Sequence, residues 1–160
     1  MEFLREDYSH IVRKSSPAGC IRAMTNPGPR ILHVEDDQID RMVVQRLLGK
    51  FGLAEGLIQA GNGLEALELL RSCPNPHPRA VLLDINMPKM NGIEFLEQIR
   101  QEPLPFATSI YMLTTSTDEW DRKSAFELGV AGYFVKPINM NGYEMLFEML
   151  KSFWALNQWP

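Results

Sequence analysis

The sequence predicts an α/β fold in which helices cover both faces of a doubly wound, five-stranded parallel sheet. After residue 30, short apolar runs alternate with longer stretches of helical spacing, roughly five times. This alternation is typical of βαβ units, which need right-handed crossovers. The run Val81–Leu83 is apolar throughout, as in a strand buried on both faces. The run then ends abruptly in Asp84.

Composition limits the classes of function. The 160 residues suffice for one domain with a full core. A net charge of -4 and a pI near 5.4 argue against a nucleic-acid-binding face. No apolar stretch approaches the length of about 20 residues that a membrane span needs. The two cysteines, Cys20 and Cys73, suggest neither a disulfide framework nor a metal cluster, so we expect a reduced cytoplasmic location.

Three segments are expected along the chain. Residues 1–29 contain two stretches rich in Pro, Gly and Ser, and we interpret them as a flexible extension. Residues 30–155 carry the repeating pattern and form the domain. Residues 156–160 form a short tail, and no output domain is expected after it.

The first two strand and helix pairs occupy residues 31–72. A strand at 31–34 runs into Glu35, Asp36 and Asp37, and the last of these acids could cap the helix that follows. That helix extends to Gly52. The spacing of its apolar residues predicts one buried face, formed by Ile39, Met42, Val43, Leu47 and Leu48. A weaker strand at 57–60 turns through 61–63 into a helix that stops before a proline-rich loop.

The remaining elements follow from the same pattern. The strand that ends at Leu83 leaves through a turn-rich loop into a helix at 91–101. Strands are predicted at 109–113 and 133–135, with a helix at 118–128 that Gly129 would stop. The last helix covers 141–155.

Polar residues follow four of these strands, and the carboxyl ends of parallel strands meet at one edge. The edge would collect Glu35, Asp36, Asp84, Thr114 and Lys136. Crowded carboxylates repel one another and are relieved by a cation or by proton uptake. Oxygen ligands with room for water favour Mg²⁺. Each residue alone also has an ordinary structural explanation; the joint arrangement is what indicates a site.

The lysine and the hydroxyl extend this prediction to phosphoryl chemistry. Lys136 could neutralise the charge of a phosphoryl group and Thr114 could donate a hydrogen bond to it. Asp84 would then be the nucleophile that forms an acyl phosphate.

The motifs at the strand ends resemble those of response-regulator receiver domains of two-component signalling, the CheY-like family. They are Ile31-Leu32-His33-Val34-Glu35-Asp36-Asp37, Leu83-Asp84-Ile85-Asn86-Met87-Pro88 with Asn91-Gly92, Met112-Leu113-Thr114-Thr115-Ser116 and Gly132-Tyr133-Phe134-Val135-Lys136-Pro137. The resemblance implies a flavodoxin-like sheet of order 2-1-3-4-5 with five helices. It also implies a signalling switch in place of a turnover enzyme, since the domain only phosphorylates and slowly dephosphorylates itself.

The resemblance assigns roles to single residues. Asp84 would accept a phosphoryl group from the phosphohistidine of a sensor histidine kinase or phosphotransfer protein. Glu35, Asp36, Asp84 and the Asn86 carbonyl would hold Mg²⁺, while Lys136 and Thr114 would contact the phosphate.

A second implication concerns the output of the switch. Phosphorylation would draw the Thr114 hydroxyl inward and let the Tyr133 ring fill the vacated space. The signal would leave through the face made by the fourth helix, fifth strand and fifth helix. Tyr133 as simple core filling is the alternative.

A narrower resemblance links the chain to small receivers that partner bacterial and cyanobacterial phytochromes. It rests on Lys151-Ser152-Phe153-Trp154 and Leu113-Thr114-Thr115-Ser116, and it implies a phytochrome as the kinase. Half of the apolar residues of the last helix are expected in the core. The surplus, especially Phe153, Trp154 and Trp159, would either form an aromatic patch for homodimerisation or kinase binding, or pack internally.

Two rival functions share features with this sequence. An aspartyl-phosphate phosphatase of the haloacid dehalogenase type uses Asp-x-Asp, but Asn86 stands at the second position here and cannot protonate a leaving group. A degenerate receiver that acts only as a binding module would lack one of the acids or the lysine, and the chain keeps them all.

Overall fold

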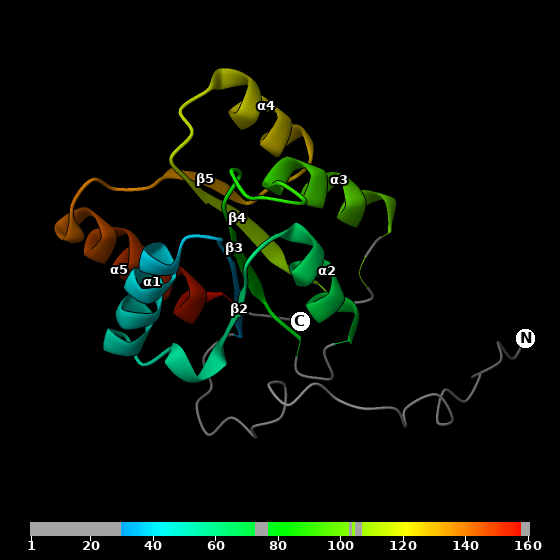
Figure 1. Cartoon of the computed structure of the whole chain (residues 1–160). Coiled ribbons are helices and arrows are strands. Elements are labelled where there is room, and N and C mark those ends of the chain that lie inside the picture. The colour runs from blue at the N-terminus through cyan, green and yellow to red at the C-terminus, as the bar shows by residue number, and fades with distance from the viewer. Residues whose placement is uncertain (1–29, 73–76, 103, 105–106, 158–160) are drawn as a thin grey trace, which may run out of the picture.

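A computed structural model describes residues 30–72, 77–102, 104 and 107–157. In this part of the chain five parallel strands form one sheet of order β2-β1-β3-β4-β5 (Figure 1). The predicted fold class and strand order are therefore confirmed. The strands are β1 (Ile31–Val34), β2 (Leu57–Ala60), β3 (Ala80–Leu83), β4 (Ser109–Thr114) and β5 (Gly132–Val135).

The helices form two layers, one on each face of the sheet (Figure 1). One layer contains α1 (Gln38–Lys50) and α5 (Met140–Leu156). The other contains α2 (Gly63–Ser72), α3 (Gly92–Gln101) and α4 (Glu119–Glu127), and a short 3₁₀ turn, η1 (Ala54–Gly56), precedes β2. Each layer encloses its own core cluster, because β1, β3 and β4 alternate their side chains between the two faces.

The predicted elements agree with the observed ones to within one or two residues. Gly129 ends the α4 segment with a φ of +76°, as predicted for a glycine stop. The expectations for residues 1–29, Cys20, Cys73 and Trp159 lie outside the described residues, and the domain boundaries remain predictions. Within the described part of the chain, no helix is both long and apolar enough to span a bilayer.

The predicted buried face of the first helix is wrong in part. Ile39 and Met42 are 71% and 68% exposed, whereas Val44, Leu47 and Leu48 face the sheet. At about 100° per residue, Val44, Leu47 and Leu48 lie on one side of the helix, with Ile39 and Met42 on the far side. The prediction from apolar spacing therefore assigned residues from two different faces of the helix to one buried face.

The last helix divides as predicted, with one correction. Leu150 and Trp154 are buried and Leu146 is partly buried, whereas Met145, Met149 and Phe153 are exposed. The expectation that Trp154 belongs to an exposed patch is wrong, because its ring packs edge-on against Tyr111 with centroids 6.2 Å apart. Phe153 is 52% exposed, so its assignment as an interface residue stays a prediction.

Candidate functional site

Three carboxylates meet at the carboxyl edge of the sheet. Val34 of β1 pairs with Leu83 of β3, so the residues that follow them, Glu35 and Asp84, lie side by side. Glu35, Asp36 and Asp84 each offer an oxygen, and these oxygens lie within 4.8 Å of one another. Glu35 and Asp84 are buried, whereas Asp36 is exposed.

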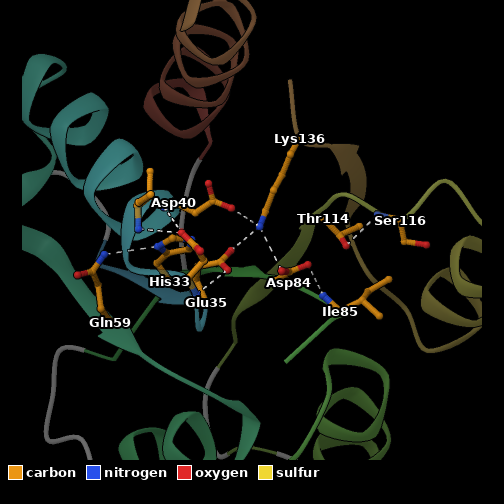
Figure 2. A network of polar contacts seen from close by, with 11 residues as sticks. His33, Glu35, Asp40, Gln59, Asp84, Ile85, Thr114, Ser116 and Lys136 are labelled. Carbon is orange, nitrogen blue, oxygen red and sulfur yellow. Dashed lines mark hydrogen bonds and ion pairs between the residues drawn. The ribbon is translucent and has the colours of Figure 1, made fainter. Parts of the chain in front are cut away.

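Lys136 brings a positive charge to this cluster. Its backbone N–H donates to the Thr114 carbonyl at 2.8 Å, which fixes the chain just after β5. The ammonium donates to Glu35 Oε2 at 2.6 Å, Asp40 Oδ2 at 2.7 Å and Asp84 Oδ2 at 3.1 Å (Figure 2). Burial alone would lower the pKa of Lys136, but the bonds to Asp40 and Glu35 outweigh it and raise that pKa well above its usual range.

The cluster carries more negative charge than one ammonium balances. Burial raises the pKa of Glu35 to about 7, against the opposing effect of its bond to Lys136. Burial of the carboxyl group is the main cause of this rise in pKa, and the nearby charge of Asp84 adds to it. Three carboxylates on adjacent loops, one of them open to water, are a donor set that suits Mg²⁺ or Mn²⁺.

The loop between β3 and α3 fixes the Asp84 side chain. The Ile85 N–H donates to Asp84 Oδ1 at 2.7 Å, and the Gly92 N–H donates to the Ile85 carbonyl at 2.9 Å. A Cβ on Gly92 would overlap the Asp84 carbonyl oxygen and lie 2.9 Å from Ile85 Cα, so only glycine fits there. Asn91 and Glu94 form a reciprocal capping box that starts α3 at this point. The Asp84 oxygen left free by the loop is Oδ2, which faces Lys136.

Thr114 and Tyr133 are both linked to Ser116 on the neighbouring loop. The fully buried Thr114 Oγ1 accepts a bond from the Ser116 N–H at 3.2 Å, and the Tyr133 hydroxyl donates to the Ser116 carbonyl at 3.1 Å. Burial raises the pKa of Tyr133. The three residues therefore form one hydrogen-bonded unit at the end of β4 (Figure 2 labels Thr114 and Ser116).

Most of the predicted site residues are brought together. Glu35, Asp36, Asp84 and Lys136 share one cluster, and Thr114 ends the strand next to β3. Asn86 lies exposed two residues after Asp84, and its role as a metal ligand stays a prediction. The chemical roles of the other predicted site residues are likewise predictions that the geometry does not test.

Sequence reasoning missed Asp40. The residue lies in the first turn of α1, where an acid is ordinarily explained by the helix dipole. The available signal was its position one turn after the acids at 35–37. Asp37 itself caps α1 through bonds from the backbone N–H groups of Ile39 and Asp40, as its helix-cap interpretation predicted.

His33 is buried in β1 beside the site and is not one of its acids or bases. Its Nδ1 lies 3.5 Å from the Gln59 side-chain nitrogen. Burial, with the charges of Lys136 and Arg41, lowers the pKa of His33 to about 3. The ring is therefore neutral at physiological pH.

Comparison with known proteins gives the same family for most of the chain. Residues 31–149 match the response regulator receiver domain. The response regulator Rcp1 of Synechocystis sp. is 34% identical over 134 residues, which cover 81% of this chain and 91% of the relative. The chemotaxis protein CheY1 of Helicobacter pylori is 31% identical over 108 residues, which cover 68% and 85%.

Solved structures of similar proteins share the fold. The phosphorylated cyanobacterial phytochrome response regulator RcpA superposes with a TM-score of 0.74 at 27% identity, covering 83% of this chain and 99% of that one. The Mn²⁺-bound form of Rcp1 gives 0.69 at 30% identity, covering 82% and 99%.

Proposed function

The chain belongs to the response regulator receiver domain family, and from that premise we propose that it accepts a phosphoryl group on Asp84 in a Mg²⁺-dependent reaction. The donor is the phosphohistidine of a sensor histidine kinase or a phosphotransfer protein. The observation that carries the proposal is the buried Asp84 carboxylate, held by its own loop beside two further acids and a lysine.

The reaction forms one bond and breaks one. Asp84 Oδ2 attacks the phosphorus, because Oδ1 is already bonded to the Ile85 N–H. The bond between phosphorus and the imidazole nitrogen breaks, and its electron pair stays on the histidine of the donor. Lys136, 3.1 Å from Asp84 Oδ2, is within reach of the oxygens of the new acyl phosphate. A Mg²⁺ held by Glu35, Asp36, Asp84 and the Asn86 carbonyl would supply charge neutralisation.

The proposed output is a change of the Thr114, Ser116 and Tyr133 unit. A dianion on Asp84 attracts the Thr114 hydroxyl, which must then give up the bond from the Ser116 N–H. Because Tyr133 is bonded to the same serine, its ring can follow. The surface of α4, β5 and α5 then presents a different face to protein partners.

The partners are proposed from the relatives. RcpA is a cyanobacterial phytochrome response regulator, and the similar structures include a response regulator in red light signaling of R. palustris and a bacteriophytochrome response regulator. These relatives support a phytochrome as the cognate kinase. Exposed Phe153 supports a homodimer through α5. We propose a cytoplasmic protein that acts through protein contacts and binds no nucleic acid.

The test is incubation with Mg²⁺ and acetyl phosphate, followed by mass measurement of the intact protein. We expect one acid-labile phosphoryl group on the wild type and on Asp37→Asn, a variant that keeps a helix-capping side chain. Asp84→Asn, or chelation of the metal, should abolish the adduct. An unmodified wild-type protein, or an equal adduct on Asp84→Asn, would overturn the proposal.

A further inference from the structure

Lys136 has three acidic partners, and one of them has no part in the phosphoryl chemistry. Glu35 and Asp84 belong to the oxygen cluster that suits a metal, whereas Asp40 lies outside it. Asp40 nevertheless makes one of the two short bonds of the ammonium, 2.7 Å against 3.1 Å to Asp84. The lysine is therefore held closer to α1 than to the proposed phosphoryl acceptor (Figure 2).

We propose that Asp40 is a positioning residue, which holds the Lys136 ammonium on the α1 side of the site and so competes with the phosphoryl group for it. The inference rests on the proposed function and deepens it.

The helix cap of α1 holds Asp40 in place. The Asp37 carboxylate accepts the Asp40 N–H at 3.0 Å as part of the α1 cap, so the backbone of Asp40 is held in the first turn of α1. Its side chain is 30% exposed, whereas that of Lys136 is 6% exposed. The pair thus joins a partly solvated carboxylate on α1 to a buried ammonium that is shared with Glu35 and Asp84.

The direction of the effect follows from charge. A phosphoryl group on Asp84 needs the ammonium to approach its oxygens, and every contact retained with Asp40 weakens that approach. Asp40→Asn removes the competing charge and leaves Lys136 with Glu35 and Asp84, which both border the phosphoryl position. The phosphorylated form should therefore become more stable relative to the free form.

The readout is the affinity for beryllofluoride, a phosphoryl mimic, measured in saturating Mg²⁺ by amide NMR shifts of the full chain. We expect Asp40→Asn to bind roughly five times more tightly than the wild type, the effect of one partly exposed ion pair. Asp40→Glu, which restores the carboxylate, should return to the wild-type value. Asp37→Asn removes an equal charge nearby without touching Lys136 and should change the affinity less.

The same substitution in a variant without Lys136 distinguishes an effect through the lysine from a general effect of removing one negative charge. In the Lys136→Met background, Asp40→Asn should no longer increase the affinity for beryllofluoride, because there is no ammonium for Asp40 and the phosphoryl mimic to compete for. An equal gain in both backgrounds, or no gain with Lys136 present, would contradict the role of Asp40 while leaving phosphoryl acceptance intact. Should the Lys136→Met background bind too weakly to measure, failure of Asp40→Glu to restore the wild-type affinity contradicts the role instead. If the wild type itself does not bind the mimic, the proposed function falls, and this inference with it.

Discussion

Two helices that flank the site differ sharply in how they are held. Of the ten residues of α3, five are buried: Gly92, Ile93, Phe95, Leu96 and Ile99. Of the nine residues of α4, all of them described, only Ala125 is buried. The end of α4 is instead tied by Arg100 of α3, which donates to the carbonyls of Leu128 and Gly129.

The difference divides the site into two sides. We call residues 84–101 together with Lys136 the anchored side, and residues 114–129 the lightly packed side. The anchored side holds the proposed nucleophile through backbone bonds and close packing. The lightly packed side depends on a few hydrogen bonds, and segments with little buried apolar contact open at low free-energy cost. The molecule thus combines a firmly held proposed acceptor, Asp84, with a neighbouring segment that can respond to a change at it.

The largest effect is expected on the anchored side, from Lys136→Met. Removal of one partner from a buried ionic cluster costs about 3–5 kcal/mol of unfolding free energy. Lys50→Met is the matched control. The pair of Lys50 with Glu144 is exposed, 2.9 Å long and expected to contribute at most about 1 kcal/mol. Denaturant unfolding of both metal-free variants at pH 8 would measure the difference, and equal losses would contradict the buried cluster.

The loss of unfolding free energy in Lys136→Met should depend on pH. The pKa of Glu35 is about 7 with the lysine present and must rise when the lysine is removed. A carboxyl group with a raised pKa in the folded state adds stability below its unfolded value and loses that contribution as pH rises through the folded pKa. The variant should therefore be less impaired at pH 5 than at pH 8, and a loss independent of pH would contradict this account.

A pair of glycines compares the two sides directly. A Cβ on Gly92 meets the backbone of Asp84 and Ile85, so Gly92→Ala should destabilise by about 3 kcal/mol. Gly129, on the lightly packed side, has a φ of +76°, and the atoms nearest to a Cβ there belong to the side-chain end of Arg100, not to backbone. Gly129→Ala should cost about 1 kcal/mol, the strain of a left-handed alanine. Equal losses in denaturant unfolding would show that the two sides are packed alike.

Thr114→Ala should cost about 1 kcal/mol of unfolding free energy for one hydrogen bond, similar to Gly129→Ala. Its consequence for the switch should be larger. Beryllofluoride should still bind, but the NMR shift changes of Ser116 and Tyr133 that we expect for the wild type should be absent. Thr115→Ala, an exposed neighbour, serves as the control. A full response of Tyr133 in Thr114→Ala would remove Thr114 from the proposed pathway.

The acidic cluster could be predicted because its residues end adjacent strands. A parallel sheet places the ends of β1 and β3 at one edge whatever the details of packing, so Glu35, Asp36 and Asp84 had to meet. Lys136 reached the same edge by the same rule. The capping role of Asp37 was local as well, because a cap bonds to residues two or three positions away.

The sequence by itself determined the order of the elements and the set of groups at the sheet edge, because strand and helix periods are local properties. Only the tertiary structure decided which groups pair. Asp40 and Lys136 are 96 residues apart, and only tertiary packing, which lets the Lys136 side chain reach the first turn of α1, brings them into contact. The same packing buried Trp154 against Tyr111 and left Ile39 and Met42 exposed. Apolar spacing along one helix does not specify which side of that helix the sheet will cover.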